Sequence, residues 1–176
     1  PIWNASPNKN QWGGSNDVQY LDTYKATTEW TTLTWKFNAA FTHDMLQFCF
    51  GKLGGTIDFD DVKLVKDGSD DNLVANGDFT TDNISAWGSN WQGPSFAIKQ
   101  GSGESAGGNF CIKYTTTKDG ANLWDHQATY KLNKTLVQGA KYVLTMKVKS
   151  TSKTKFAFWP IWNASPNKNQ WGGSND

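Results

Sequence analysis

The segment YVLTMKVK, residues 142 to 149, decides the fold class because its large apolar side chains occupy every second position. Successive side chains of a β-strand point to opposite faces, so a period of two predicts a strand with one buried face. The segment TLTWKF, residues 32 to 37, shows the same alternation. The two segments therefore predict half-buried strands of a sheet.

Short apolar runs separated by turn residues continue this signal along the rest of the chain. No ten-residue window holds a convincing helical period, and clusters of Gly, Asn, Asp and Ser bound the runs. Many short strands with turns between them predict an all-β fold, a β-sandwich of the jelly-roll type. The additional strands are expected at residues 45–50, 56–64, 96–98, 110–116, 128–132 and 156–162.

The strand predicted at residues 56–64 changes phase near its middle. Ile57 and Phe59 lie on one face of an ideal strand, whereas Val62 lies on the other. One extra residue in a strand produces such a slip, and it re-aims the side chains that follow. We therefore expect a β-bulge at residues 60–61.

The chain ends by repeating its own beginning. The string PIWNASPNKNQWGGSND occurs at residues 1–17 and again, unchanged, at residues 160–176. Natural repeats are imperfect and recur at a fixed period, whereas nothing between residues 18 and 159 matches this string. The duplication indicates an engineered circular permutant. The polar Gly-Ser step within residues 67–71 resembles a fusion scar, so we place the original termini there.

The length predicts one domain. Counting the duplicated string once leaves 159 of the 176 residues, enough for a single core, and we treat residues 1–176 as one permuted domain. Two copies of the string compete for one place in that domain. Either one copy is displaced, or a spare end docks into a neighbouring chain, which would give a strand-swapped oligomer.

The charge distribution argues against some partners. The net charge is +1, and every one of the 17 basic residues is a lysine. Nucleic-acid recognition depends on bidentate guanidinium contacts and on a clustered basic face. No apolar run approaches the length that crosses a membrane. We therefore expect neither a nucleic acid nor a membrane as partner.

The two cysteines are predicted to be structural. Cys49 and Cys111 each lie inside an apolar, strand-like run, and neither has metal-ligand spacing. Two buried free thiols are the interpretation we favour. A disulfide stays open for a secreted protein, because the sequence does not show whether the two Cα atoms lie within bridging distance.

Few residues suggest catalysis. Glycoside hydrolysis normally needs two carboxylates about 5 to 10 Å apart. Only two glutamates exist, Glu29 in a polar turn and Glu104 in a Gly-Ser loop, and neither is in a buried strand. His43 fits a turn. We therefore expect a protein that is not an enzyme, and a glycoside hydrolase of β-sandwich fold, built on an aspartate pair, is the alternative.

Aromatic rings beside neutral amides are the most suggestive pattern in the chain. In WDHQ, residues 124–127, a tryptophan precedes three polar side chains at the head of a predicted strand. The duplicated string also sets tryptophans among Asn and Gln. Rings offer flat apolar platforms, and amides both donate to and accept from hydroxyl groups. The pattern favours a neutral, polyhydroxylated ligand such as a sugar.

Several motifs, read in the permuted order, resemble the family 4 and family 22 carbohydrate-binding modules. NLVANGDF, residues 72–79, resembles their opening strand, and GTIDFDDVKL, residues 55–64, resembles their closing strand. WDHQAT, residues 124–129, resembles the part of xylan-binding members that carries a stacking tryptophan. GAKY, residues 139–142, resembles the entry to their next strand. The resemblance covers essentially the whole unique sequence.

This resemblance implies a jelly roll whose concave sheet forms an open cleft for soluble β-1,4-linked polysaccharides. Xylan is the expected ligand, and cellulose or mixed-linkage glucan comes next. Such modules are non-catalytic and are usually appended to secreted glycoside hydrolases. The resemblance therefore implies a xylanase as parent protein and an extracellular, cell-surface or periplasmic location. A protein-binding adhesion module is a third interpretation.

The resemblance also assigns site residues by position. It implies that Trp124 stacks on the sugar and that Gln127 is its polar neighbour. Gln47 matches a position where xylan binders can have a hydrogen-bonding histidine on a cleft strand. Tyr20 falls near a cleft arginine of a relative.

Further aromatic residues of the cleft are implied in or near the duplicated string. Trp12 or its copy Trp171 falls near the second aromatic wall of the cleft. Trp159 and Trp162 have opposite strand parity, so at most one of them should face the cleft unless a bulge at Pro160 intervenes.

A structural calcium ion near the joined termini is the cofactor that the resemblance implies. Asp60 matches the acidic position on the closing strand, and Asp78 offers oxygen nearby, as a hard cation requires. The glutamate usual after the phenylalanine of the opening motif is Thr80 in this chain.

Overall fold

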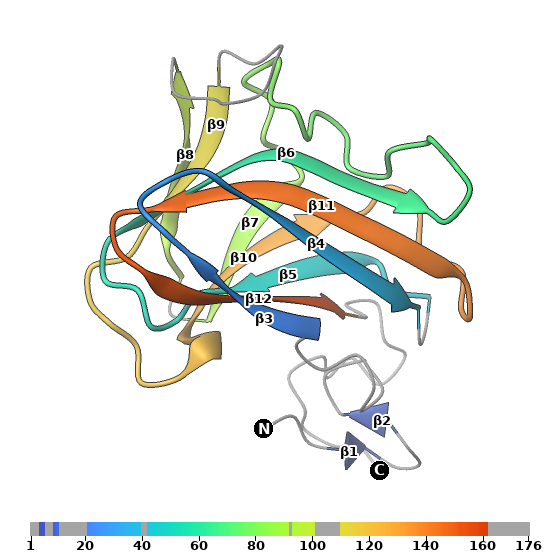
Figure 1. Ribbon diagram of the computed structural model, residues 1–176, viewed down its shortest axis with the longest axis horizontal. Helices are drawn as coiled ribbons and strands as arrows, with labels where there is room; N and C mark the ends of the chain where they lie inside the picture. The colour runs from blue at the N-terminus through green and yellow to red at the C-terminus, as the bar shows by residue number, and fades with distance from the viewer. Residues whose placement is uncertain are drawn as a thin grey trace.

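The chain forms a two-layer β-sandwich in the computed structural model shown in Figure 1. The structure describes residues 4–5, 9–10, 21–39, 42–91, 93–100 and 110–161. In these ranges the only helical element is a short 3-10 helix, η2 (Leu123–Asp125). The all-β fold class predicted by the alternating segments is therefore confirmed.

Two five-stranded sheets make up the sandwich, and all neighbouring strands within them are antiparallel. The first sheet contains, in spatial order, β3 (Leu21–Ala26), β12 (Thr154–Ile161), β5 (Met45–Cys49), β10 (His126–Lys131) and β7 (Trp87–Trp91). The second sheet contains β4 (Thr31–Asn38), β11 (Lys141–Ser150), β6 (Thr56–Lys66), β9 (Phe110–Thr115) and β8 (Ser95–Gln100). A separate short pair joins β1 (Asn4–Ala5) to β2 (Lys9–Asn10).

Consecutive strands change sheet at nearly every connection. From β3 to β12 the chain stays in one sheet only between β8 and β9. Alternation of this kind is the jelly-roll pattern, in which neighbours in sequence face each other across the core. It also explains how β6 and β9, far apart in sequence, come to be paired in the second sheet.

The core lies between the sheets and is rich in aromatic rings. Trp35 of β4 is 1% exposed, and its ring centroid lies 5.5 Å from that of Phe158 on β12. Phe48 of β5 and Phe59 of β6 meet across the layers with centroids 5.6 Å apart. Large aromatic side chains bury much apolar surface, so this cluster supplies a main part of the free energy of folding.

The predicted β-bulge is confirmed on β6. Thr145 of β11 lies opposite Lys63, whereas Lys147, two residues further, lies opposite Asp60. β6 therefore accommodates one extra residue, and Asp61 takes a left-handed conformation with φ 48°. Its carboxylate reaches back to Lys147, with Nζ and Oδ2 2.8 Å apart.

Two strands of the sandwich, β3 and β7, were not predicted from the sequence, and neither was the short pair β1 and β2. β3 and β7 contain polar residues and glycine at positions where alternation would place apolar ones. Pairing with stronger neighbours, β12 and β10, forms these edge strands. The segment 67–71, where we place the original termini, is an exposed turn directly after β6.

Candidate functional site

The first sheet carries polar side chains on the face that points away from the core. Leu46 and Phe48 of β5 are core residues, so the alternate positions Gln47 and Cys49 belong to the opposite face. Gln47 is paired with Thr129 of β10, and Cys49 with Gln127. We call Gln47, Cys49, Gln127 and Thr129 the polar strip.

The polar strip is buried, and two of its oxygen atoms lack partners. Gln47 is 0% exposed and Gln127 is 3% exposed. The Oε1 atom of each side chain has no hydrogen-bond partner among the protein atoms. Buried polar atoms are almost always paired in folded proteins, so two open acceptors on one face are unusual.

The donor ends of the same amides are already engaged. Gln127 donates from Nε2 to the main-chain oxygen of Trp124 over 2.8 Å. Gln47 donates from Nε2 to the Sγ atom of Cys49 at 3.8 Å. Each amide nitrogen has a second hydrogen and can still donate, but the atoms without any partner are the two oxygens, which require a ligand with donors.

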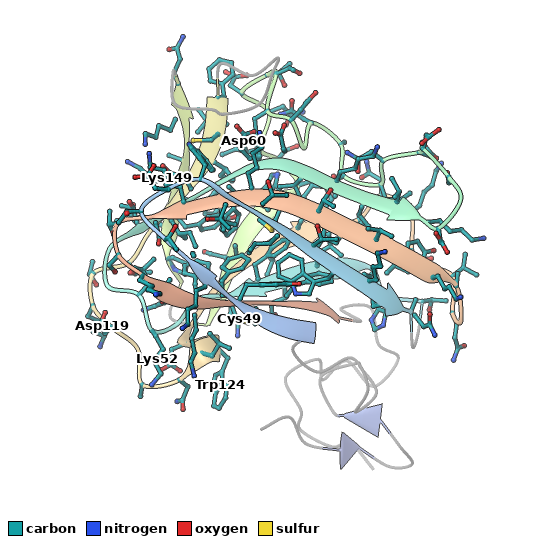
Figure 2. The ribbon with its side chains drawn as sticks, viewed as in Figure 1. Cys49, Lys52, Asp60, Asp119, Trp124 and Lys149 are labelled. Atoms are coloured by element: carbon teal, nitrogen blue, oxygen red, sulfur yellow. The ribbon has the colours of Figure 1, made fainter. Side chains whose placement is uncertain are left out.

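Trp124 lies at one end of the polar strip, in η2. Its side chain is half-buried, and Figure 2 shows it at the edge of the molecule, with Lys52 nearby. The hydrogen bond from Gln127 connects the turn that carries this ring to the strip itself. A partly exposed aromatic ring suits stacking against the C–H face of a sugar.

The sequence around η2 explains why the turn forms. Asn122 and Asp125 cap it reciprocally, and the main-chain nitrogen of Asn122 donates to Oδ2 of Asp125 over 2.9 Å. Gly51 donates from its main chain to the oxygen of Leu123 over 2.7 Å. A Cβ atom on Gly51 would overlap the carbonyl oxygen of Asn122, so only glycine permits this approach.

Cys49 on the polar strip is a protonated thiol. Burial raises its pKa from 9.0 to about 12, and the hydrogen bond from Gln47 opposes this only in part. A thiol with such a pKa is a poor nucleophile at neutral pH. Both cysteines are free and buried, as the sequence predicts.

The predicted ligand-binding residues divide into three groups. Gln47 and Gln127 lie on the same strip, and Gln127 contacts the main chain of Trp124. Trp159 occupies the position on β12 opposite Gln47, but its side chain lies outside the described part of the structure. Four further predicted residues lie outside the described residues altogether: Tyr20, Trp12, Trp171 and Trp162.

Histidine 126, which the sequence placed beside Trp124, does not belong to the polar strip. It alternates with Gln127 and is 3% exposed. Its Nε2 atom lies 2.9 Å from the main-chain oxygen of Lys118. His43, expected in a turn, lies in a loop but is 0% exposed. Thr129 and Cys49 were missed as strip residues, although their spacing of two from Gln127 and Gln47 was a usable signal.

The residues proposed for calcium lie on adjacent segments. Asp60 is buried on β6, whereas Asp78 is exposed in the loop that follows. The two segments are joined by a hydrogen bond of 2.7 Å from the nitrogen of Val62 to the oxygen of Gly77. Within the described ranges, no three His, Cys, Asp or Glu side chains gather as metal ligands. Calcium takes six to eight oxygens, so further ligands would have to come from main-chain carbonyls or water.

Comparison with known proteins gives no independent assignment. No protein-family model, no curated protein and no solved structure matches the chain. The part of the chain that the structure describes contains no helix that is long and apolar enough to span a membrane.

Proposed function

We propose that the protein is a non-catalytic module that binds a neutral β-1,4-linked polysaccharide, xylan first, on the outer face of the first sheet. One observation carries the proposal. Two buried amide oxygens without partners lie on the same strip, and one of these amides also holds the turn that presents Trp124.

The chemistry of a neutral sugar matches these groups. Each hydroxyl of a sugar can donate to an open amide oxygen, and a buried acceptor without a partner costs about 1 to 3 kcal/mol. A hydroxyl that reaches Oε1 of Gln47 or Gln127 would recover that free energy. The ring of Trp124 would add stacking against the apolar face of the sugar.

Access to the oxygens is part of the proposal. Because Gln47 and Gln127 are buried in the ligand-free chain, a glycan reaches their oxygens only if the strip opens on binding. Trp124 is already half-exposed, so it would make the first contact. We therefore expect slower association than for a preformed open cleft.

Affinity electrophoresis in gels that contain xylan, hydroxyethyl cellulose, mixed-linkage glucan or mannan tests the proposal. We expect retardation on xylan. Migration at the same rate in all gels as in a gel without polysaccharide would show that the protein is not a glycan-binding module of this kind.

Two further assays on the purified protein distinguish the alternative functions. Release of reducing sugar from xylan, abolished by changing one aspartate, would favour a glycoside hydrolase. Capture of a protein that no sugar competes away would favour an adhesion module. We keep a secreted xylanase as the proposed parent of the module.

A structural calcium ion at Asp60 and Asp78 is a second proposal. The hydrogen bond from the nitrogen of Val62 to the oxygen of Gly77 supports it, because it joins the segment that carries Asp60 to the segment that carries Asp78. If calcium is bound, chelation lowers the thermal midpoint of unfolding and added calcium restores it. An unchanged thermal midpoint after exhaustive chelation would show that calcium does not stabilise the fold.

A further inference from the structure

The outer face of the second sheet carries an excess of lysine, although the chain as a whole is nearly neutral. Strand alternation places the core residues of β11 and β6 inward and leaves their lysines outward. Seven lysines share this face with three aspartates. The lysines are Lys36, Lys63, Lys99, Lys113, Lys141, Lys147 and Lys149, and the aspartates are Asp58, Asp60 and Asp61.

The strand register arranges the lysines in successive rows, and Figure 2 shows Lys149 and Asp60 on this sheet. Lys149 of β11 lies opposite Asp58 of β6, which lies opposite Lys113 of β9. Rows on one face of an antiparallel sheet follow each other at about 7 Å. Moving along the sheet, the next four rows contain Lys147, then Lys63, then Lys36, then Lys141. We call the seven lysines of this face the lysine track.

Most of the lysine track is not neutralised by the aspartates. Lys99 pairs with Asp58 at 2.9 Å, and Lys147 with Asp61 at 2.8 Å. Among the described residues, Lys36, Lys63 and Lys141 form no ion pair, and all three are exposed. One end of the second sheet therefore presents unpaired positive charge in three consecutive rows.

The neighbouring side chains narrow the kind of partner. The described residues of this face include no aromatic ring, and the chain has no arginine. Bases stack on aromatic rings, and protein partners anchor on Trp, Tyr and Arg. Amphipathic membrane-surface sites use large apolar side chains that enter the lipid, such as Trp, Phe and Leu, and the described residues of this face include none of these three. Lysine ammonium groups on a flat hydrated face instead suit point-charge pairing with carboxylates.

We propose that the lysine track binds an acidic polysaccharide, one that carries carboxylate groups along its chain. The polymer would lie along the strands, so that carboxylates meet the ammonium groups of successive rows. This site is on the opposite side of the sandwich from the polar strip and does not depend on the proposed function. The two sites could contact neutral and acidic chains at the same time.

Affinity electrophoresis in polygalacturonate gels, at ionic strengths from ~0.02 M to ~0.3 M, tests the inference because salt screens such contacts. We expect retardation at low salt that disappears at high salt. The triple variant Lys36→Gln, Lys63→Gln, Lys141→Gln should bind about tenfold more weakly. The control Lys25→Gln, Lys118→Gln, Lys153→Gln removes the same charge from exposed lysines elsewhere, and it should bind like the parent.

Each contrary outcome identifies a different error. An equal loss in both triple variants would show that net charge alone, and not the lysine track, causes binding. Retardation that survives high salt and disappears in Trp124→Ala would assign acidic polymers to the polar strip. Equal affinity for single-stranded DNA or for anionic lipid vesicles would overturn the choice of a polysaccharide. If Trp124→Ala still binds polygalacturonate, the inference is supported even if the parent protein does not bind xylan.

Discussion

Gln127 shows how one side chain can serve two purposes in the proposed site. Its amide nitrogen holds the carbonyl of Trp124, and its amide oxygen is one of the two open acceptors. The side chain therefore holds the turn that carries the ring, and it also offers an open hydrogen-bonding group. Gln47 has no such positioning role, because its donor contacts the neighbouring sulfur.

The variant Gln127→Met tests both roles of Gln127 in ligand binding without a large change in the stability of the fold. Gln127→Met removes one hydrogen bond and one unpaired acceptor while keeping similar volume, so we expect a change below about 1 kcal/mol in the free energy of unfolding. Affinity for xylan should fall about five- to tenfold. Urea unfolding and calorimetric titration measure the two quantities. Unchanged affinity in a folded variant would show that Gln127 serves neither role.

The buried thiols give a prediction for alkaline pH. Burial raises the pKa of both Cys49 and Cys111 from 9.0 to about 12. Above about pH 9 the unfolded thiols ionise while the folded ones stay protonated, so the folded state binds more protons. The free energy of unfolding should therefore decrease as pH rises from about 9 towards 12.

Urea unfolding at about pH 8 and about pH 10 measures this decrease. The double variant Cys49→Ala, Cys111→Ala should lose less stability over the same interval. Tyr114 and Tyr130 also have raised pKa values and act in the same direction, but only nearer pH 10 and above. Equal losses in the parent and the double variant would contradict the assignment to the thiols.

At the scale of elements, the position of η2 depends on a close contact between two loops. The loop after β5 and the loop before η2 exchange main-chain hydrogen bonds through Gly51, which bonds to both Gly120 and Leu123. Neither loop would hold the turn alone. The proposed ring platform is therefore built by a contact that is remote in sequence.

Gly51→Ala should disrupt this contact. The added methyl group would overlap the carbonyl of Asn122, and we expect a loss of more than about 2 kcal/mol in stability. Gly68→Ala is the control, because its φ of 78° gives backbone strain but the new Cβ atom meets nothing within 4 Å. That variant should lose only about 1 to 2 kcal/mol. Denaturant unfolding compares them, and equal losses would show that the loop contact is unimportant.

The strands that could be predicted from the sequence are those in which apolar and polar residues alternate within the strand itself. β4 and β11 alternate cleanly, and the slip at residues 60–61 predicted the bulge of β6. β3 and β7 could not be found in this way, because pairing with neighbours forms them. The lysine track could not be predicted from the sequence either, because its residues are spread over five strands and only the strand register brings them together.

The candidate site was predictable in part for the same reason. Aromatic and amide residue types pointed to Trp124 and Gln127, and the structure joins them by a hydrogen bond. No residue pattern predicted that the two amides would be buried with their oxygens unpaired. Those properties arise from strand pairing across β5 and β10.

At the scale of the whole molecule, the sandwich separates two chemically different outer faces. The first sheet has a buried strip of neutral amides with the exposed Lys25, Lys131 and Lys155 on its outer strands and strand ends, whereas the second has lysines in successive rows across its outer face. The connections between the sheets differ as well. The turn at residues 67–71 is exposed, whereas the loop after β5 packs against the loop before η2.

This difference predicts where the chain tolerates insertion. About four Gly-Ser residues inserted between Gly68 and Ser69 should shift the thermal midpoint by less than about 3 °C, because exposed turns accept added length. The same insert between Gly54 and Gly55 should lower it much further, since Gly54 donates to Asp119 and Gly55 to Thr116 across that contact. Calorimetric melting compares them. Similar shifts at both places would argue against original termini near residues 67–71.

The most direct test of the central claim is the affinity of a β-1,4-xylo-oligosaccharide for the parent, for Trp124→Ala and for Trp30→Ala, measured by titration calorimetry. Trp30 is a matched control, half-buried like Trp124 but located in the turn between β3 and β4, away from η2 in Figure 1. We predict that Trp124→Ala raises Kd at least about tenfold while Trp30→Ala leaves it unchanged. Equal affinity of all three proteins, or no binding by the parent, would contradict the account.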